Sequence, residues 1–416
     1  MSNRYNSGRP GKRAFGGSNR GGGGFKRNGR SVKFKKGPKK QYINPERFIK
    51  KAKPLKHTVY EPQNSFDDFE LHNKLKDNLR SAQITTPTKI QDQSIPHSVT
   101  GRDVLGLANT GTGKTIAFLA PLISRIIHGD CKKALIIAPT RELAQQIQAE
   151  SRRISRGLRI FDVLLIGGMS IGPQLRDLSR QHQIVIGTPG RIKDHLERGT
   201  LDLTDLDVVV LDEVDRMLDM GFVNDIRSIL SSAPSEKQSL FFSATMDNKI
   251  EGLINQFGNE PIKIVATTAD TSDNVEQSVT YYNDKAHKID LLHDLLVEEG
   301  VDKVLIFCET KRYTDRLSRE LADRGFKAGS IHGDKSQGQR KRALEQLKQN
   351  RLNILVATDV AARGIDVDGI SHVVNYDTPQ SYEDYTHRIG RTGRGNNQGY
   401  SVTFVEQPRS NNNRSY

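Results

Sequence analysis

The chain has no tryptophan, only two cysteines and no long apolar run among its 416 residues. Cysteine scarcity argues against a disulfide-stabilised scaffold, and no run approaches the ~18 apolar residues of a membrane helix. Cys131 and Cys308 are far apart and each adjoins a β-rich apolar run, so we expect two buried thiols in a reducing compartment. No hydrophobic stretch resembles a signal peptide at the N-terminus, and we expect a cytoplasmic protein.

Acidic residues are absent from residues 1–45, where thirteen lysines and arginines occur. Because the whole chain has a net charge of +14, the remaining residues carry only +1. The segment is rich in glycine, asparagine and serine, a composition that cannot bury enough apolar surface to fold, so we expect a disordered basic tail. Single aromatic residues among its arginines can stack on bases, which predicts RNA tethering. A tail that serves only solubility is the alternative.

The rest of the chain alternates short β-rich runs with helical patterns, which predicts parallel sheets covered by helices on both faces. We expect an α/β fold with one domain at 65–266, a linker at 267–274 and a second domain at 275–408. Residues 46–64 form a transitional segment, and residues 409–416 a short polar tail. The predicted strands are 104–107, 134–138, 160–166, 184–187, 208–211, 239–242 and 262–264, then 275–282, 304–308, 328–331, 354–357, 372–375 and 400–405. Predicted helices include 141–154, 225–232 and 288–298.

Residues 108–115 read Ala-Asn-Thr-Gly-Thr-Gly-Lys-Thr and stand between a β-rich run and an apolar helical pattern. That context is typical of a phosphate-binding loop, in which backbone N–H groups and a helix start face the anion. We expect Lys114 to reach the β- and γ-phosphates of ATP, and the Thr115 hydroxyl to bind Mg²⁺. Ala108 replaces the first glycine of the strict pattern, and a glycine turn before an ordinary helix is the alternative. The remaining predicted ATP-binding residues of this loop are Thr110, Gly111, Thr112 and Gly113.

A second acidic element, Asp212-Glu213-Val214-Asp215, follows the apolar run at 208–211. A buried parallel strand that ends in carboxylates delivers them to a nucleotide at the carboxyl edge of the sheet. We expect Asp212 to hold Mg²⁺, largely through water, and Glu213 to orient and deprotonate the attacking water. A solvated acidic turn is the alternative.

With these two elements the chain resembles the DEAD-box RNA helicases, ATP-dependent enzymes of superfamily 2 built from two RecA-like domains. The resemblance covers about residues 66–405 and implies ATP and Mg²⁺ as cofactors. The family signature Asp-Glu-Ala-Asp has valine at position 214 here. One apolar residue replaces another, so we expect catalysis to be retained.

The resemblance also implies residues that bind adenine and residues that couple the two ligands. Residues 86–91 match the family's adenine-reading element, so Gln91 is implied to bond to the base and the upstream Phe66 to stack on it. Gln83-Ile84 stands where the family usually has Gly-Phe. Ser243 and Thr245 are implied to bond to Asp215 and so to connect the state of ATP to the grip on RNA. Alone, such small hydroxyl residues are common in turns.

The residues implied to bind RNA follow predicted strands, where loops and helix starts offer N–H groups to phosphate oxygens. Contacts of this kind read phosphates and 2′-hydroxyls, so we expect weak sequence preference. An ordinary loop is the alternative for each taken singly. In the first domain they are Pro139, Thr140, Arg141, Gly167, Gly168, Thr188, Pro189, Gly190 and Arg191, and in the second Thr310, Gln337, Arg340 and Thr358.

Residues 387–394 read His-Arg-Ile-Gly-Arg-Thr-Gly-Arg, which alone would be a basic turn. The resemblance implies that Arg391 and Arg394 are arginine fingers that approach the γ-phosphate when the domains close. It also implies that His387 takes part in coupling. Gly364 and Asp366 are implied to lie at the ATP site, with Asp366 on the ribose.

These residues together predict RNA-stimulated ATP hydrolysis coupled to cleft closure and to local, largely sequence-independent unwinding of RNA duplexes. ATP and a single RNA strand each bridge the two domains, so binding of one should favour the other. An ATP-dependent RNA clamp without productive unwinding is the alternative, and a DNA translocase is a third. Glu213, Arg391 and Arg394 favour turnover over clamping. We expect a monomer that makes no contact with a membrane.

Overall fold

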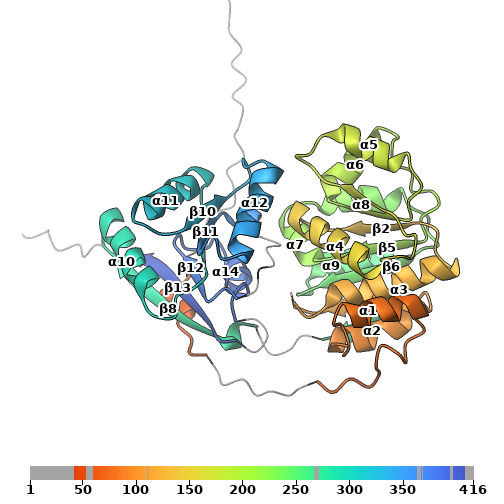
Figure 1. Ribbon diagram of the computed structural model, residues 1–416, viewed down its shortest axis with the longest axis horizontal. Helices are drawn as coiled ribbons and strands as arrows, with labels where there is room; N and C mark the ends of the chain where they lie inside the picture. Colours follow the sequence, from red (N-terminus) through yellow and green to blue (C-terminus); the bar gives the residue numbers. More distant parts are fainter. Residues whose placement is uncertain are drawn as a thin grey trace, which may run out of the picture. The chain divides into compact units, whose positions relative to one another are not determined.

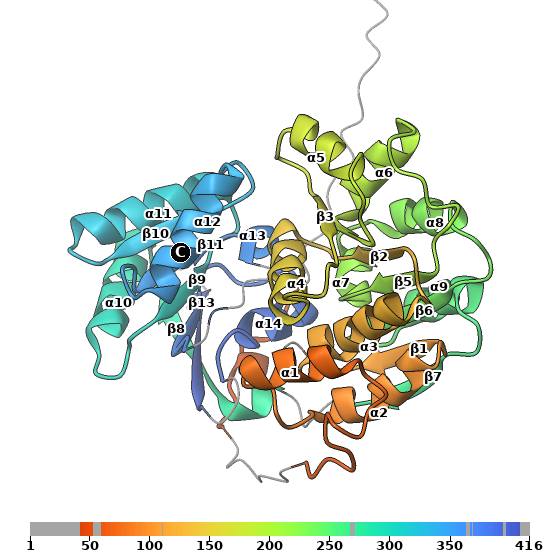
Figure 2. The same cartoon turned by 45° about the vertical axis from the view of Figure 1, so that its right-hand side comes forward.

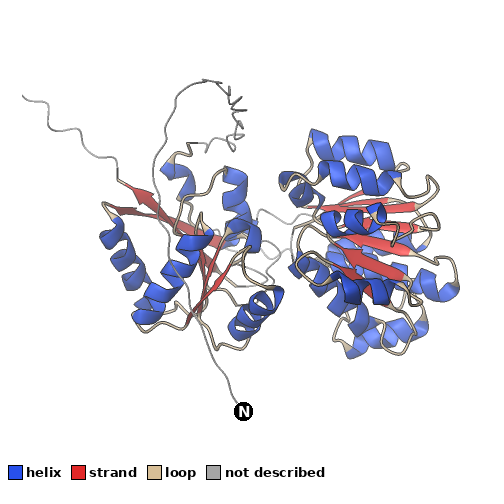
Figure 3. Cartoon of the chain, turned by 90° about the horizontal axis from the view of Figure 1, so that it is seen from above, coloured by secondary structure: helices blue, strands red, loops and turns tan. Residues whose placement is uncertain are grey.

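The computed structural model describes residues 42–52, 60–109, 111–266, 271–362, 367, 369–393 and 397–407. Within these ranges the chain forms two α/β domains, each built on a parallel sheet that lies between helices (Figures 1 and 3). The predicted fold class is therefore confirmed. Most of the predicted basic tail, the first half of the predicted linker and the predicted C-terminal tail lie outside the described residues.

The first sheet has the strand order β3-β4-β2-β5-β6-β1-β7, and every neighbouring pair is parallel. Because β1 and β5 are separated only by β6, the loops that follow them open at the same edge of the sheet. The strands are β1 (Val104–Leu107), β2 (Ala134–Ile137), β3 (Asp162–Leu165), β4 (Ile184–Gly187), β5 (Val208–Leu211), β6 (Gln238–Ser243) and β7 (Ile262–Val265).

Successive residues of these strands enter opposite halves of the core, as the pleat of a strand requires. Val208 and Val210 pack against α1 to α4, whereas Val209 and Leu211 pack against α6 to α9 (Figure 2). Burial on both faces explains why the strands are continuous apolar runs. The helices are α1 (Asn73–Ser81), α2 (Lys89–Val99), α3 (Lys114–His128), α4 (Arg141–Ile154), α5 (Ile171–Leu178), α6 (Pro189–Glu197), α7 (Val214–Asp219), α8 (Val223–Ser231) and α9 (Asn248–Phe257).

The second sheet has the order β10-β11-β9-β12-β13-β8 and is also parallel throughout. Its strands are β8 (Val275–Tyr282), β9 (Val304–Phe307), β10 (Ala328–Ile331), β11 (Ile354–Ala357), β12 (His372–Asn375) and β13 (Gly399–Glu406). Its helices are α10 (Lys285–Val297), α11 (Lys311–Asp323), α12 (Gln337–Lys348), α13 (Asp359–Ala362) and α14 (Tyr382–Ile389). All thirteen predicted strands are confirmed, with ends that differ by at most two residues.

Two short 3₁₀ helices, η1 (Pro45–Phe48) and η2 (Thr271–Asn274), precede the two domains in sequence. Phe48 of η1 is fully buried, and it packs with residues of the second domain, although the first domain follows η1 in the chain. Burial in this cluster explains why the segment carries apolar residues, which its sequence context alone does not explain.

We predict that Phe242→Ala lowers the free energy of unfolding of the first domain by roughly 3–5 kcal/mol, the cost of emptying a large buried site. Phe242 is fully buried on β6, and its ring lies 5.5 Å from that of Phe118. Urea denaturation would measure the change in the first-domain transition. Phe161→Ala is the matched control, because that ring is 54% exposed and its loss should cost less than about 0.5 kcal/mol. An equal shift for both variants would contradict the assignment of Phe242 to the core.

Candidate nucleotide and RNA site

The loop between β1 and α3 has the backbone of a phosphate-binding loop. Gly111 and Gly113 have φ of 85° and 93°, which L-residues with a side chain seldom adopt. A Cβ at Gly113 would also lie 2.4 Å from Gln91 Nε2, so both conformation and space require glycine there. Thr110 lies outside the described residues.

Lys114 is buried at the first position of α3, and its Nζ donates to the Ala108 carbonyl at 3.0 Å. A cavity of about 380 Å³ adjoins it and is lined by Thr115, Asp212 and Glu213 as well as by the loop glycines. Arg391 lines the same cavity from the second domain. The predicted phosphate-binding and acidic residues are thus brought together around one space.

Asp212 follows β5 and is almost fully buried. Burial raises the pKa of its carboxyl group to about 6, although Lys114 opposes that rise. Its Oδ1 is buried and has no hydrogen-bond partner among the described groups. No cluster of three or more His, Cys, Asp or Glu side chains is arranged for a metal in the described ranges. An unpaired carboxylate oxygen near Thr115 fits Mg²⁺, which keeps most of its water ligands.

Glu213 stands at the turn into α7 with φ 54°, a strained conformation for a residue with a side chain. Its Oε2 accepts from Arg216 Nη1 at 2.5 Å, and both side chains are buried. Burial alone would raise the pKa of Glu213, but Arg216, Lys114 and Arg391 outweigh it and lower the pKa to about 2. The carboxylate is therefore ionised. It can accept hydrogen bonds, but it is a weak base.

Asp215 links the end of β5 to the loop after β6. Its Oδ2 accepts from the N–H groups of Ala244 and Thr245 at 2.9 and 3.0 Å and lies 3.4 Å from Thr245 Oγ1. The Asp215 N–H donates to Ser243 Oγ at 3.3 Å. The structure thus brings Ser243 and Thr245 onto Asp215, while their coupling role stays a prediction.

Gln91 and Phe66, the residues predicted to contact adenine, both contact other residues of the first domain. Gln91 Nε2 donates to the Gly113 carbonyl at 3.0 Å, and its Oε1 accepts from Thr88 N at 2.9 Å. One N–H and one lone pair of the amide remain for a base. Phe66 is buried, edge-on to Phe69 at 5.7 Å, so stacking of its ring on adenine stays a prediction.

The helix start at Arg141 and the glycine pair after β3 lie against each other. Thr140 caps α4 by accepting from Leu143 N at 3.2 Å, and Pro139 precedes it. A Cβ at Gly168 would fall 2.1 Å from Arg141 Nη1, and Gly168 has φ of 74°. Glycine at 168 therefore leaves room for the guanidinium group, which brings predicted RNA-binding residues of two loops together.

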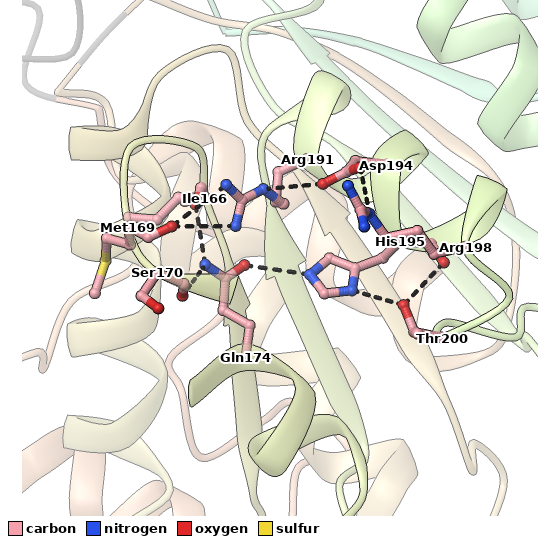
Figure 4. Close-up of polar contacts among 9 residues, drawn as sticks. All are labelled: Ile166, Met169, Ser170, Gln174, Arg191, Asp194, His195, Arg198 and Thr200. Carbon is pink, nitrogen blue, oxygen red and sulfur yellow. Dashed lines mark hydrogen bonds and ion pairs between the residues drawn. The ribbon is translucent and has the colours of Figure 1, made fainter. Parts of the chain in front are cut away.

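Hydrogen bonds connect this glycine loop to α6, the helix that begins at Pro189 (Figure 4). Gln174 Nε2 donates to the carbonyls of Ile166 and Ser170 at 3.2 and 3.3 Å, and its Oε1 lies 3.4 Å from Nε2 of buried His195. His195 Nδ1 lies 2.8 Å from Thr200 Oγ1. Burial lowers the pKa of His195, with a smaller effect from Arg191, and favours the neutral ring. Because the Gln174 amide nitrogen serves two carbonyls, His195 Nε2 must be the donor to Oε1.

Arg191 closes the same loop from the other side, since both of its Nη atoms donate to the Met169 carbonyl at 3.4 Å (Figure 4). Thr188 and Gly190 occupy the first turn of α6 beside it. The sequence analysis missed Gln174 and His195. The spacing of four residues between Arg191 and His195, which places both on one face of α6, was the only signal available.

Of the second-domain residues predicted to bind RNA, two lie at the end of a strand or the start of a helix and two are buried on one helix. Thr310 caps α11 by accepting from Tyr313 N at 3.3 Å, and Thr358 follows β11. Gln337 and Arg340 are buried on α12. Both bind Glu142 of α4, through Gln337 Nε2 at 3.2 Å and Arg340 Nη2 at 2.8 Å. A phosphate contact by Arg340 would require this ion pair to separate.

The segment 387–393 begins in the last turn of α14 and contains two arginines with different surroundings. Arg388 is buried and pairs through Nε and Nη2 with Asp359 at 2.6 and 2.8 Å, which fixes α14 to α13. Arg391 is also buried and lines the nucleotide cavity. His387 lines a smaller hollow beside them. Arg394, Gly364 and Asp366 lie outside the described residues.

Both cysteines are buried and free, as predicted. Burial raises the pKa of Cys131 to about 12 and raises that of Cys308 well above its usual value. Inert thiols are the consequence. In the described ranges no helix combines the length and the apolar character that crossing a membrane demands.

The fold and the site define a nucleotide-binding protein with two tandem RecA-like domains. Comparison with protein families gives the same result: residues 88–253 match the DEAD/DEAH box helicase model, and residues 287–396 match the helicase conserved C-terminal domain model. The chain belongs to the DEAD-box helicase family, as the sequence resemblance predicted.

Individual relatives agree with this assignment. The chain is 44% identical over 347 residues to the ATP-dependent RNA helicase CshA of Listeria monocytogenes, and that match covers 83% of the chain but 66% of the relative. Among solved structures, S. cerevisiae Dbp5 bound to RNA and ADP BeF3 is similar with a TM-score of 0.73 and 28% identity, over 83% of this chain and 90% of that one. Mss116p bound to single-stranded RNA and AMP-PNP is similar with a TM-score of 0.72 and 31% identity, over 81% and 73%.

We predict that Gln174→Leu weakens RNA binding by about tenfold or more. The substitution removes the hydrogen bonds that hold the glycine loop to α6. It also leaves the buried Ile166 carbonyl without its hydrogen bond from Gln174, at a cost of about 1–3 kcal/mol. ATP affinity should stay within about twofold, since Gln174 does not line the nucleotide cavity. Fluorescence anisotropy with labelled RNA and with labelled nucleotide would measure both. Leu175→Ala, an exposed neighbour, is the control. Unchanged RNA affinity in the glutamine variant would show that the network does not position the RNA-binding loop.

Proposed function

We propose that the chain is an ATP-dependent RNA helicase, in which RNA-stimulated ATP hydrolysis drives local, largely sequence-independent unwinding or remodelling of RNA duplexes. The single observation that carries the proposal is the cavity that holds Lys114, Asp212 and Glu213 together with Arg391. Three of these residues come from the first domain and the arginine from the second. Hydrolysis that needs all four therefore depends on the arrangement of the two domains.

The phosphates of ATP would take the place of the Ala108 carbonyl as the partner of Lys114, with the N–H groups of Gly111 and Gly113 around them. Asp212 and Thr115 would hold Mg²⁺, which supplies positive charge to the β- and γ-phosphates. Its low pKa makes Glu213 a weak base, so we assign it chiefly to orienting the attacking water. Arg391, with Arg394 as predicted from the resemblance, would neutralise charge that develops on the γ-phosphate.

RNA would bind along the loops that carry Thr140, Arg141, the glycine pair and the start of α6, with Thr310 and Thr358 contributed by the second domain. The similar structure of Dbp5 holds RNA and that of Mss116p holds single-stranded RNA, which supports RNA over DNA. N–H groups and hydroxyls at helix starts favour backbone contacts over base contacts. Asp215 would carry the coupling, because it bonds to both Ser243 and the loop that follows.

We predict that Lys114→Ala abolishes ATP hydrolysis, with a loss of at least about 10³-fold, because the buried ammonium group is the principal charge on the transferred phosphate. Steady-state phosphate release with and without RNA would measure it. The wild-type chain should show hydrolysis that rises with added RNA. Full-rate hydrolysis without RNA would contradict the proposed division of the site between the domains.

A duplex-release assay separates the helicase from the alternative clamp. The wild-type chain should release the short strand of an RNA duplex with ATP over many turnovers, whereas a non-hydrolysable analogue should support at most one cycle of binding. Equal release with both nucleotides would favour the clamp. A DNA duplex with the same sequence serves as the control for 2′-hydroxyl dependence.

We predict that residues 1–45 tether RNA through charge. Deleting residues 1–42 should weaken RNA binding and reduce the slope of log affinity against log salt concentration, since all thirteen cationic side chains of the segment are lost. Binding of one labelled RNA at a series of salt concentrations would measure the slope. An unchanged slope would show that the segment makes no ionic contact with RNA.

A further inference from the structure

A short segment that precedes the first domain in sequence folds as part of the second domain. Ile43 and Phe48 share a hydrophobic cluster with Val275 of β8 and with Tyr385 and Ile389 of α14. The Phe48 ring is fully buried, and its centroid lies 4.6 Å from that of Tyr385. We call residues 43–50 the clasp.

Polar contacts order the clasp and attach its last residue to β8. Asn44 Oδ1 accepts from Glu46 N at 3.1 Å and so starts η1, and the Arg47 guanidinium lies 4.0 Å above the Tyr382 ring. Lys50 forms an antiparallel backbone pair with Gln277, with N–H···O distances of 3.0 and 2.8 Å. Because β8 is the last strand of its sheet, this pair covers part of an otherwise open edge.

The chain next makes contacts on the first domain, beside the residue predicted to bind adenine. Asp92 of α2, which follows Gln91, accepts from Tyr60 Oη at 2.5 Å and from the N–H groups of Gln63 and Asn64 at 2.8 and 3.1 Å. Lys50 and Tyr60 are ten residues apart, so the chain lets these two anchors separate by roughly 36 Å at most.

The clasp contacts the helix that leads to Arg391. Tyr385 and Ile389 are four residues apart, so they lie on one face of α14, and the clasp covers that face. Arg391 is the second residue after the end of the helix, and it lines the nucleotide cavity. A neighbouring side of α14 is fixed by the pair between Arg388 and Asp359. The helix is therefore held from two sides, one of which is supplied by a segment more than 200 residues earlier in the chain.

We propose that the clasp is a positioning element for ATP hydrolysis, which orients α14 and Arg391 and, by packing on the second domain, links it to the segment that leads into the first domain, in addition to the covalent connection between β7 and β8. The proposal rests on the proposed function, since it assigns the clasp a role in that reaction. Phe48 is its central residue. It acts through α14 and does not line the nucleotide cavity.

The test compares three variants of the full chain: Phe48→Ala, Phe48→Leu as the conservative variant, and Ile49→Ala as the matched control, because Ile49 is 57% exposed. We expect Phe48→Ala to lower kcat of RNA-stimulated ATP hydrolysis by roughly ten- to a hundredfold, as small misplacements of a catalytic group do. Affinity for nucleotide should stay within twofold, because the phosphate-binding loop is untouched. Phe48→Leu should recover most of the rate, and Ile49→Ala should match the wild type.

Hydrogen exchange provides a second readout that does not depend on activity. In Phe48→Ala the amides of residues 382–389 should exchange at least tenfold faster, while those of β9 and β12 keep their protection and so report a folded domain. If kcat and exchange in residues 382–389 both match the wild type, the clasp does not position the helix. A kcat that rises would also overturn the proposal, since the clasp would then restrain the reaction.

The two proposals fail in different ways. If the wild-type chain shows no RNA-stimulated hydrolysis, the proposed function fails, and exchange in residues 382–389 still decides whether the clasp orders α14. If Phe48→Ala exposes β9 and β12 to exchange, Phe48→Leu and a second variant, Arg47→Ala, take its place. Faster exchange in residues 382–389 with slower hydrolysis in either of them supports the clasp, and wild-type values in both overturn it.

Discussion

The structure depends on a group of buried charges at the carboxyl edge of the first sheet that must neutralise one another. Lys114, Arg216 and Arg391 are buried there together with three carboxylates, those of Asp212, Glu213 and Asp215. Three positive and three negative charges leave the group balanced, which is the condition under which ions tolerate burial. A triphosphate adds several negative charges to this group. The balance can then be kept only by a further cation, which is a physical reason for Mg²⁺.

The parallel sheet makes this concentration of charge possible. Strands β1, β5 and β6 run in one direction, so the loops that carry Lys114, Asp212 and Ser243 meet at one edge. Regular apolar strands below them hold the backbone rigid, and the starts of α3 and α7 carry Lys114 and Asp215. Val214, which departs from the family signature, is fully buried in the core beneath this edge, so its methyl groups are accommodated by packing away from the nucleotide.

Sequence reasoning predicted the strands because their signal is local. A strand buried on both faces is a continuous apolar run, and glycine or polar residues mark its ends. The phosphate-binding loop and the acidic element were found for the same reason, as short contiguous patterns. The pair between Arg340 and Glu142 could not be found in this way, since it joins helices far apart in sequence and each residue alone resembles an ordinary surface charge. Position 48 is the extreme case, because its partners lie more than 200 residues away.

What the sequence left out concerns how the parts are connected. The bond from Asp215 to the loop after β6, the network from Gln174 to His195 and the packing of Phe48 on α14 all join a binding element to another element. Such contacts are made by side chains that touch no ligand, so no ligand-binding pattern marks them. A helicase couples two ligands through elements that move as units, and coupling of this kind requires rigid connections within each unit. The hydrogen bonds and buried rings described here provide rigid connections of this kind in both domains.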